Sequence, residues 1–395
     1  MKLSQQFSKK QWVLIAVIFL LLAGCVPLPI DPHWASLTTI GDAQQILFAF
    51  HDRVALVDPI DGSAVELRDG SGQVRVDAQS GSPLVWSLQI PAQPATQFYY
   101  APILVDDATI LLPSFNRRFY EVDLQAARLL TPEGRLIEAD TTTSHIVADV
   151  LATDDMLYVP LSEGDVKAID RSSFTERWTF NTEHGIWSEP LLVDNTLYVT
   201  ALDHNLYAID PETGDEIWRV SLEGAAPARP VFHEGYLYVG SFARKLFKID
   251  LDGRIAAQAT VNDWIWGTVA VEGDNLYVGD ASGYVYAFDI SGADLNEMWQ
   301  RKVADRTIRA TPLIHEDQLI VASRDHRAYW LSRADGGEIF RRELIGEVLA
   351  DMLVIEPNDA TNITEAYVII STMARDESLV AFTLENGERR WAYRH

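Results

Sequence analysis

The chain has 395 residues, 57 of them acidic and 32 basic, which gives a formal net charge of −25. This charge disfavours non-specific binding of nucleic acid or anionic lipid by the chain as a whole. The single cysteine, Cys25, excludes an intramolecular disulfide, so stability must come from packing. The length permits two or more domains, unless the sequence is a repeat array.

The first 25 residues carry an export signal. Three lysines precede an apolar stretch at residues 12–23. As a helix this stretch would span about 18 Å, against a hydrocarbon core of about 30 Å. A basic start followed by a short apolar stretch is typical of a secretory signal peptide. The stretch ends in Leu22-Ala23-Gly24-Cys25, which resembles the bacterial lipobox.

We therefore predict a lipoprotein signal peptide at residues 1–24, lipidation of Cys25, and a lipidated tether at residues 25–39. An uncleaved anchor with an incidental cysteine is the alternative. Several acyl chains would hold the body at a lipid bilayer, outside the cytoplasm. In a double-membraned bacterium Val26 favours the outer membrane, facing the periplasm; otherwise the location is the outer side of the cytoplasmic membrane.

Downstream of this signal the sequence repeats. The repeat is clearest in LYAIDPETGDEIW at residues 206–218, which contains Asp210. Consecutive copies in the middle of the chain are 40, 40 and 39 residues apart, the length of a four-stranded propeller blade. The equivalent residues of the eight copies, of which the last two are degraded, are Asp58, Asp123, Asp170, Asp210, Asp250, Asp289, Ser332 and Thr383.

Each repeat contains four short runs rich in β-branched and aromatic residues. In the copy around Asp210 the runs PLLVD, TLYVTAL, NLYAID and EIWRV are separated by turn residues. No segment has a sustained helical period. The pattern predicts an all-β fold, an eight-bladed β-propeller of four-stranded antiparallel blades, as a single domain over residues 40–395.

A tryptophan follows the last turn of most repeats. In the clearest copy Gly214 supplies the positive φ of a tight turn, and Asp210 and Thr213 bond the backbone around it. Trp218 is predicted to pack between neighbouring blades rather than to stack on a ligand. The same structural docking role falls to Trp178, Trp299 and Trp391, with Phe340 as a substitute and Trp86 serving after a long insertion.

The motif Ala-x-Asp-x-x-Thr-Gly-x-x-x-Trp, complete at residues 208–218, resembles the tryptophan-docking motif of the pyrroloquinoline quinone (PQQ)-like repeat propellers. Together with the lipobox, it makes the chain resemble the BamB family of lipoproteins, from the outer-membrane β-barrel assembly machinery. The resemblance covers roughly residues 40–395. It implies a membrane-anchored, non-catalytic interaction scaffold of the bacterial cell envelope. A surface adhesion module is another interpretation.

The same propellers include quinoprotein dehydrogenases, which hold PQQ and Ca²⁺ over the central channel, often under a ring of two adjacent cysteines. With Cys25 lipidated no cysteine remains here, and no Asp-x-[Asp/Asn]-x-[Asp/Asn]-Gly calcium loop occurs. We therefore expect no catalytic residue, metal site or cofactor. A PQQ- or small-ligand-binding enzyme or sensor at the channel mouth is the alternative. His204 and His326, in equivalent turns, are interpreted as solvated turn residues.

Reversal of the chain at every turn sorts the loops onto two faces. The first-to-second and third-to-fourth turns share a rear face that is overwhelmingly acidic. We interpret it as a solubility device, with weak capture of divalent cations as the alternative. The second-to-third turns and the connections into the first strands share the other face, here called the mouth face. It carries arginine and lysine, with Asp165, Asp376 and Glu377 as exceptions.

One position in the connections into the first strands reads Tyr99, Val147, Trp187, Pro227, Trp266, Arg309 and Leu349, and is predicted to ring the channel mouth. Arginine and aromatic residues are typical of binding hot spots. We hypothesise that the mouth face docks an envelope protein or an extended peptide; partly buried packing and solvated arginines are the alternative. The candidate partner-binding residues are Tyr99, Trp187, Trp266, Arg309, Arg117, Arg118, Arg244, Lys245 and Arg327.

Closure of the ring stays open at this stage. Residues 34–50 either supply the inner strand of the first blade or close the ring against residues 390–392. The insertion at residues 67–98 is expected to be a loop with one strand around Trp86. Residues 356–366 are expected to form an enlarged loop in the eighth blade.

Overall fold

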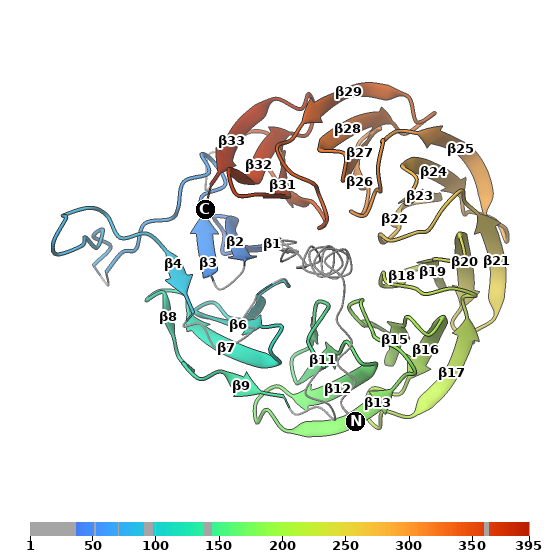
Figure 1. Cartoon of the computed structure of the whole chain (residues 1–395), viewed down its shortest axis with the longest axis horizontal. Coiled ribbons are helices and arrows are strands. Elements are labelled where there is room, and N and C mark those ends of the chain that lie inside the picture. Colours follow the sequence, from blue (N-terminus) through green and yellow to red (C-terminus); the bar gives the residue numbers. More distant parts are fainter. Residues whose placement is uncertain are drawn as a thin grey trace, which may run out of the picture. The chain divides into compact units, whose positions relative to one another are not determined.

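The computed structural model describes residues 37–50, 53–69, 71–90, 98, 100–137, 144–358 and 363–394. Over these residues the chain forms eight antiparallel sheets around an axis, and no helix (Figure 1). The colours of Figure 1 run once around the ring from blue to red, so blades follow one another in chain order. The predicted eight-bladed, all-β propeller is confirmed.

In each blade the first strand lies nearest the axis and the last strand lies at the rim (Figure 1). Blades 1 and 2 consist of β1 (Leu37–Ile40), β2 (Gln45–Phe50), β3 (Arg53–Val57), β4 (Ser87–Gln89), β5 (Ile103–Asp106), β6 (Thr109–Pro113), β7 (Arg118–Asp123) and β8 (Arg128–Leu129), with β9 (Arg135–Leu136) also paired to β7. Blades 3 and 4 consist of β10 (Leu151–Ala152), β11 (Met156–Pro160), β12 (Asp165–Asp170), β13 (Glu176–Asn181), β14 (Leu191–Val193), β15 (Thr196–Thr200), β16 (Asn205–Ile209) and β17 (Glu216–Ser221).

The second half of the ring is more regular. Blades 5 and 6 consist of β18 (Val231–His233), β19 (Tyr236–Ser241), β20 (Lys245–Asp250), β21 (Ile255–Thr260), β22 (Ala270–Glu272), β23 (Asn275–Gly279), β24 (Tyr284–Asp289) and β25 (Asn296–Lys302). Blades 7 and 8 consist of β26 (Leu313–His315), β27 (Gln318–Ser323), β28 (Arg327–Ser332), β29 (Glu338–Glu343), β30 (Leu353–Ile355), β31 (Tyr367–Ala374), β32 (Glu377–Thr383) and β33 (Arg389–Tyr393).

Burial follows the position of a strand within its blade. The two middle strands of blade 4, β15 and β16, are buried at every residue after the first, because neighbouring blades cover both faces of the sheet. The rim strand β17 alternates between exposed and half-buried residues. A β-bulge between the third and fourth strands recurs in blades 3 to 8, which disrupts the exposed sheet edge at the rim.

The blades are joined by a recurring hydrogen bond. In seven of the eight seams within the described residues, a side-chain N–H of one blade donates a hydrogen bond to a backbone carbonyl of the next blade. The acceptor is the residue directly after the repeat position that Asp210 occupies in blade 4. Trp178, for example, donates from Nε1 to the carbonyl oxygen of Pro211 at 2.9 Å. The other donor–acceptor pairs are Trp86–Leu124, Trp218–Leu251, Lys248–Ile290, Trp299–Arg333, Trp330–Leu384 and Trp391–Pro59.

The indoles rest on glycine in the adjoining turn. Gly214 has φ +78°, and a Cβ there would lie 2.6 Å from the Trp178 ring. A side chain at this place is thus excluded by both the backbone and the neighbouring indole. Asp210 supports the same turn by accepting the N–H groups of Glu212 and Thr213. The docking tryptophans are largely buried, Trp178 at 8% exposure and Trp391 at 7%.

Two seams keep the hydrogen bond with different residues. In blade 5 the residue at the docking position is Ala257, and its cross-strand partner Lys248, 2% exposed, donates from Nζ to the carbonyls of Ile290 and Gly292. In blade 7 Phe340 has no N–H to give, and its cross-strand partner Trp330 donates instead. The seam therefore selects for a donor rather than for tryptophan as such.

The seam between blades 2 and 3 is built the other way round. Here the turn position that holds Gly214 in blade 4 holds Phe174, with φ +58°. The Phe174 ring packs edge-to-face on Phe119 of blade 2 at 5.5 Å, and the Arg135 guanidinium lies 4.8 Å from its centre. The aromatic ring is thus supplied by the later blade instead of the earlier one.

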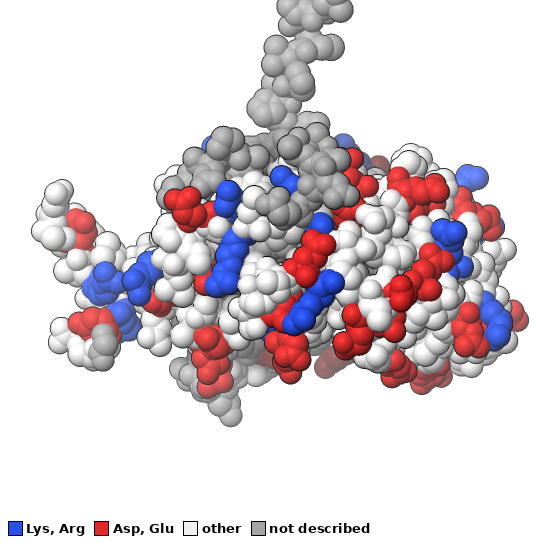
Figure 2. Space-filling view, turned by 90° about the horizontal axis from the view of Figure 1, so that it is seen from below, with Lys and Arg blue, Asp and Glu red and all other residues white. Residues whose placement is uncertain are grey.

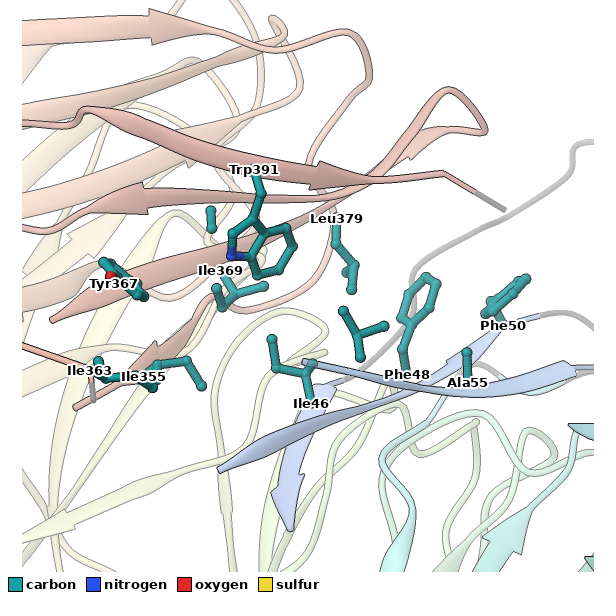
Figure 3. Close-up of a cluster of buried hydrophobic side chains, with 12 residues drawn as sticks. Ile46, Phe48, Phe50, Ala55, Ile355, Ile363, Tyr367, Ile369, Leu379 and Trp391 are labelled. Atoms are coloured by element: carbon teal, nitrogen blue, oxygen red, sulfur yellow. The ribbon is translucent and has the colours of Figure 1, made fainter. Parts of the chain in front are cut away.

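In the described part of the chain the ring closes by side chains, without a strand shared between its two ends. β1 is the inner strand of blade 1 and pairs with β2, while β33 pairs with β32. This decides the open alternative in favour of residues 37–40 as the inner strand; β1 begins inside the segment that the sequence assigns to the tether. Trp391 donates to Pro59 across the junction, and Figure 3 shows side chains of β2 and β3 meeting those of blade 8 in one cluster.

Two insertions modify the ring. Residues 58–69 and 71–85 belong to an arm beyond the rim, between β3 and β4, folded by short bridges such as Arg68 with Val74 and Val76 with Pro83 (Figures 1 and 2). The loop between β30 and β31 bridges Asn358 with Ile363. This loop also reinforces closure, because Asn358 Nδ2 donates to the carbonyl of Asp42 at 2.6 Å.

Candidate functional site

The mouth of the channel is built by the connections that enter the first strands. In each, a fully buried apolar residue precedes the mouth residue; these buried residues are Ile146, Ile186, Ala226, Ile265, Ile308 and Val348. The N–H of Ile186 donates to the carbonyl of Leu161 in the previous blade at 3.2 Å, and Ile308 does the same to Asp280 at 3.1 Å. The buried residue fixes the backbone, so the next side chain faces the channel.

These mouth residues surround a cavity of about 500 Å³. Of the seven positions that the sequence predicts to ring the mouth, six line this cavity: Val147, Trp187, Pro227, Trp266, Arg309 and Leu349. Tyr99 lies outside the described residues, and its neighbour Tyr100 lines the cavity. The register inferred from the repeat therefore brings together side chains that are about 40 residues apart in sequence.

A ladder of stacked groups leads from the mouth face into the cavity. Trp264, 47% exposed, stacks on Phe242 with ring centres 4.9 Å apart, and Phe242 contacts Trp266 at 4.7 Å. The Arg309 guanidinium then lies 5.1 Å from the centre of the Trp266 ring. On the neighbouring side of the mouth Trp187 is 44% exposed. Two half-exposed indoles on one face of a ring are typical of a binding surface.

Charged groups line the same cavity one step further in. The Arg229 guanidinium donates to Glu189 at 2.6 Å, and Thr311 gives Asp351 both its N–H, at 2.6 Å, and its hydroxyl, at 2.8 Å. Asp149 accepts the N–H of Ala101 at 2.7 Å. These bonds run between adjacent blades, so the polar ring also holds the connections in place around the axis.

Burial shifts the pKa values of two cavity groups. It raises the pKa of the Asp149 carboxyl to about 6, and the neighbouring charges of Glu189 and Asp351 act in the same direction while Arg229 opposes them. Burial lowers the pKa of Arg309, a shift that leaves an arginine charged at neutral pH. Asp149 therefore changes its charge close to physiological pH.

The predicted basic residues of the second-to-third turns lie outside the cavity and have acidic or carbonyl partners. Lys245 contacts Glu223 at 2.6 Å, Arg327 contacts Glu343 at 2.9 Å, and Arg118 donates to the carbonyl of Glu133 at 2.8 Å. Arg117 and Arg244 occupy left-handed turn positions, with φ +63° and +61°. Their carbonyls accept the N–H groups of Ile137 and Val261, which ties each turn to the end of its rim strand.

The two histidines have the same turn role. His204 and His326 occupy the equivalent left-handed positions, φ +76° and +66°, and their carbonyls accept the N–H groups of Leu222 and Leu344. The aspartate before each histidine accepts a tyrosine hydroxyl, as Asp203 does from Tyr207 at 2.6 Å. Recurrence of this bond in Asp325 and Tyr329 makes it part of the blade framework.

The mouth face carries both signs of charge. Sequence reasoning placed arginine and lysine there but assigned no acidic residue to the connections that leave the rim strands. Glu347 of such a connection pairs with both Arg306 and Arg324, and Asp305 pairs with Arg327. The face is a mosaic rather than a basic patch, and Figure 2 shows the same intermingling of red and blue on the side of the ring.

Sequence reasoning also missed Trp264, Phe242 and the inner charged ring. Trp264 stands two residues before a mouth position, where other blades have His145, Gly185 or Ala225, so no repeat signal marks it. The charged ring was detectable, since Asp149, Glu189 and Asp351 each come two residues after a mouth position.

Within the described ranges no group of three or more His, Cys, Asp or Glu side chains is placed to hold a metal ion. In the same part of the chain no helix is long and apolar enough to span a bilayer. Cys25 lies outside the described residues, so lipidation stays a prediction.

Comparison with known proteins shows which of them this chain is similar to. The family model described as outer membrane protein assembly factor BamB matches residues 202–311 and 283–395. The chain is a propeller of PQQ-like repeats and resembles BamB. A search of curated proteins finds no match.

Solved structures share the fold at low sequence identity. BamB from Moraxella catarrhalis is 15% identical with a TM-score of 0.64, covering 88% of this chain and 95% of its own. Sqt1 from Saccharomyces cerevisiae is 14% identical with a TM-score of 0.65, covering 90% and 98%. The computationally designed Ika8 protein is 13% identical with a TM-score of 0.59, covering 91% and 97%. Such likeness concerns the fold alone.

Proposed function

We propose that this BamB-like propeller is a non-catalytic scaffold of the bacterial cell envelope that binds another envelope protein, or an extended peptide, on its mouth face. The observation that carries the proposal is the clustering of Trp187, Trp266 and Arg309 around one cavity, with Trp264 joined to Trp266 through the Phe242 ring. The family match supports an assembly role. Nucleic acid is an unsuitable partner for a chain of net charge −25.

We further propose that Cys25 anchors the chain to a bilayer, in the outer membrane facing the periplasm where the cell has two membranes and otherwise on the outer side of the cytoplasmic membrane. The lipobox supports this, and a non-covalent scaffold benefits because tethering raises its local concentration near membrane partners. The acidic rear face would keep the body away from anionic lipid.

A quinone cofactor fits the mouth poorly. The cavity has two tryptophans, but two of its three carboxylates, Glu189 and Asp351, are committed to Arg229 and Thr311. In the described part of the chain no oxygen cluster of the kind that Ca²⁺ needs is present. We therefore propose that the protein is not an enzyme. Absorbance spectra with and without PQQ and Ca²⁺, with a dye-linked alcohol oxidation assay, test this; a quinone band with turnover would contradict it.

The docking proposal is tested by removing the two half-exposed indoles. Trp187→Ala with Trp264→Ala is expected to reduce capture of a cross-linked envelope partner by about 30-fold or more, since one hot-spot truncation costs roughly 2 kcal/mol. The measurement is quantitative mass spectrometry of cross-linked eluates.

A matched control truncates apolar residues at the rim, which are equally exposed. Ile217→Ala with Ile339→Ala, at 54% and 51% exposure, should leave capture unchanged. Equal capture by the indole variant and the wild-type chain, with circular dichroism unchanged in both, would refute docking at the mouth.

A further inference from the structure

We propose that the channel cavity is a socket for one cationic side chain, lysine or arginine, of a polypeptide that lies across the mouth face. The inference rests on the proposed docking function and adds the chemistry of the group that the cavity takes. It is carried by three features of the cavity: aromatic walls, an excess of carboxylates, and a carboxylate that lacks a cationic partner.

The walls suit a cation. Trp187 and Trp266 both line the cavity, whose volume of about 500 Å³ accommodates a lysine or arginine side chain. Indole rings attract cations through their negatively charged faces, most strongly where the cation is desolvated. The protein already uses this attraction, because Arg309 lies against one side of Trp266. Within the described residues Trp187 has no such cation against its ring.

The residues that line the cavity include one more carboxylate than guanidinium group. Three carboxylates, Asp149, Glu189 and Asp351, face two guanidiniums, Arg229 and Arg309. Glu189 is neutralised by Arg229 at 2.6 Å. Asp351 takes two bonds from Thr311. Asp149 takes one backbone N–H, from Ala101, and forms no ion pair within the described chain.

Other occupants fit less well. An acidic side chain would approach the three carboxylates and be repelled by them. An apolar side chain would displace water from Asp149 without giving the carboxylate a partner, which costs free energy. An ammonium or guanidinium group supplies charge and hydrogen-bond donors to Asp149 and contacts the indoles at the same time.

The protonation of Asp149 gives the proposal a pH signature. A cation binds the ionised carboxylate, and the pKa of Asp149 is raised to about 6 by burial and by Glu189 and Asp351, against Arg229. Binding should therefore be strongest above pH 7 and weaken as pH falls through 6. With that pKa about nine-tenths of the carboxyls are protonated at pH 5, so affinity should drop about ten-fold.

The probe is a pair of synthetic peptides, acetyl-Leu-Thr-Lys-Thr-Leu-amide and the same peptide with glutamine in place of lysine. Each is titrated into the full-length chain in detergent, and binding is followed by tryptophan fluorescence at pH 7.5 and pH 5. The lysine peptide is expected to bind at least about ten-fold more tightly than the glutamine peptide at pH 7.5, and to lose that advantage at pH 5. Equal binding of the two peptides at pH 7.5, or tighter binding of the glutamine peptide, would overturn the proposal.

Variants separate the carboxylate from the fold. Asp149→Asn keeps an acceptor for Ala101 and should remove both the lysine preference and its pH dependence, whereas Asp149→Glu should retain them. Asp154→Asn, an exposed carboxylate on the rear face, is the matched control and should behave as wild type. Full lysine preference in Asp149→Asn would overturn the socket. Partner capture that fails in the indole variant but survives in Asp149→Asn would leave docking intact and refute the socket alone.

Discussion

Asp149 shows at the residue scale how a cavity group can oppose folding. Its pKa of about 6 lies above the usual aspartate value of 3.8, so the folded state binds the proton more tightly than the unfolded state. The linkage therefore favours folding fully below pH 4, and this contribution disappears as pH rises through 6. At neutral pH the ionised carboxylate costs free energy, because burial disfavours its charge and no cationic side chain pairs with it in the described part of the chain.

We therefore expect Asp149→Asn to stabilise the protein at neutral pH. Two pKa units correspond to about 3 kcal/mol, and partial exposure reduces this to roughly 1–2 kcal/mol at pH 7.5. Urea unfolding of the variant and the wild type at pH 7.5 and pH 4 measures the difference, which should vanish at the lower pH. A destabilised variant at pH 7.5 would show that the carboxylate supports the connections instead of straining them.

The element scale concerns the seams between blades, where one hydrogen bond recurs with different donors. The docking tryptophans could be predicted from the sequence, because a large residue recurs at a fixed distance from a turn. It did not display Lys248, since this donor sits on the third strand and only the strand register places it opposite Ala257. The role of Phe174 could not be predicted for the same reason, because its packing on Phe119 depends on which blade is the neighbour.

The seam of blade 5 can be tested by exchanging its donor. Lys248→Ala should cost about 2–4 kcal/mol, because it removes a buried cation and leaves two carbonyls without a donor. Lys248→Ala with Ala257→Trp recreates the pair that Ala208 and Trp218 form in blade 4, and should recover at least about 1 kcal/mol. Chemical denaturation gives the free energies of unfolding.

Ala257→Trp alone is the control, since it crowds Lys248 and should be destabilising. If the double variant is only as stable as the two single changes predict when added, Lys248 does not stand in for the docking tryptophan.

At the scale of the whole molecule, the eight blades and the composition of the mouth followed from sequence, because both depend on a local unit that recurs. The manner of closure did not, since residues 37–40 fit an inner strand and a shared outer strand equally well. The charge mosaic of the mouth face also escaped, because Glu223 and Glu347 belong to connections without a repeated motif.

Closure by side chains makes the junction of blades 8 and 1 a point of opening. Trp391→Ala removes a buried indole and its bond to Pro59, which should cost roughly 3–5 kcal/mol. Because no strand spans the junction, hydrogen exchange should rise first in blades 1 and 8. Trp218→Ala is the matched variant at an internal seam, where the chain itself crosses to the next blade. Uniform acceleration of exchange around the ring in Trp391→Ala would contradict this view of closure.

The buried residue ahead of every mouth position has an evolutionary consequence. Ile186, Ile265 and their counterparts fix the main chain whichever residue type follows. Tryptophan, proline, valine and arginine can therefore occupy the same position of the repeat in different blades. Each of these mouth residues can therefore be substituted without destabilising the fold. During evolution, single substitutions at the mouth positions could thus change the binding partner while the propeller fold stays the same.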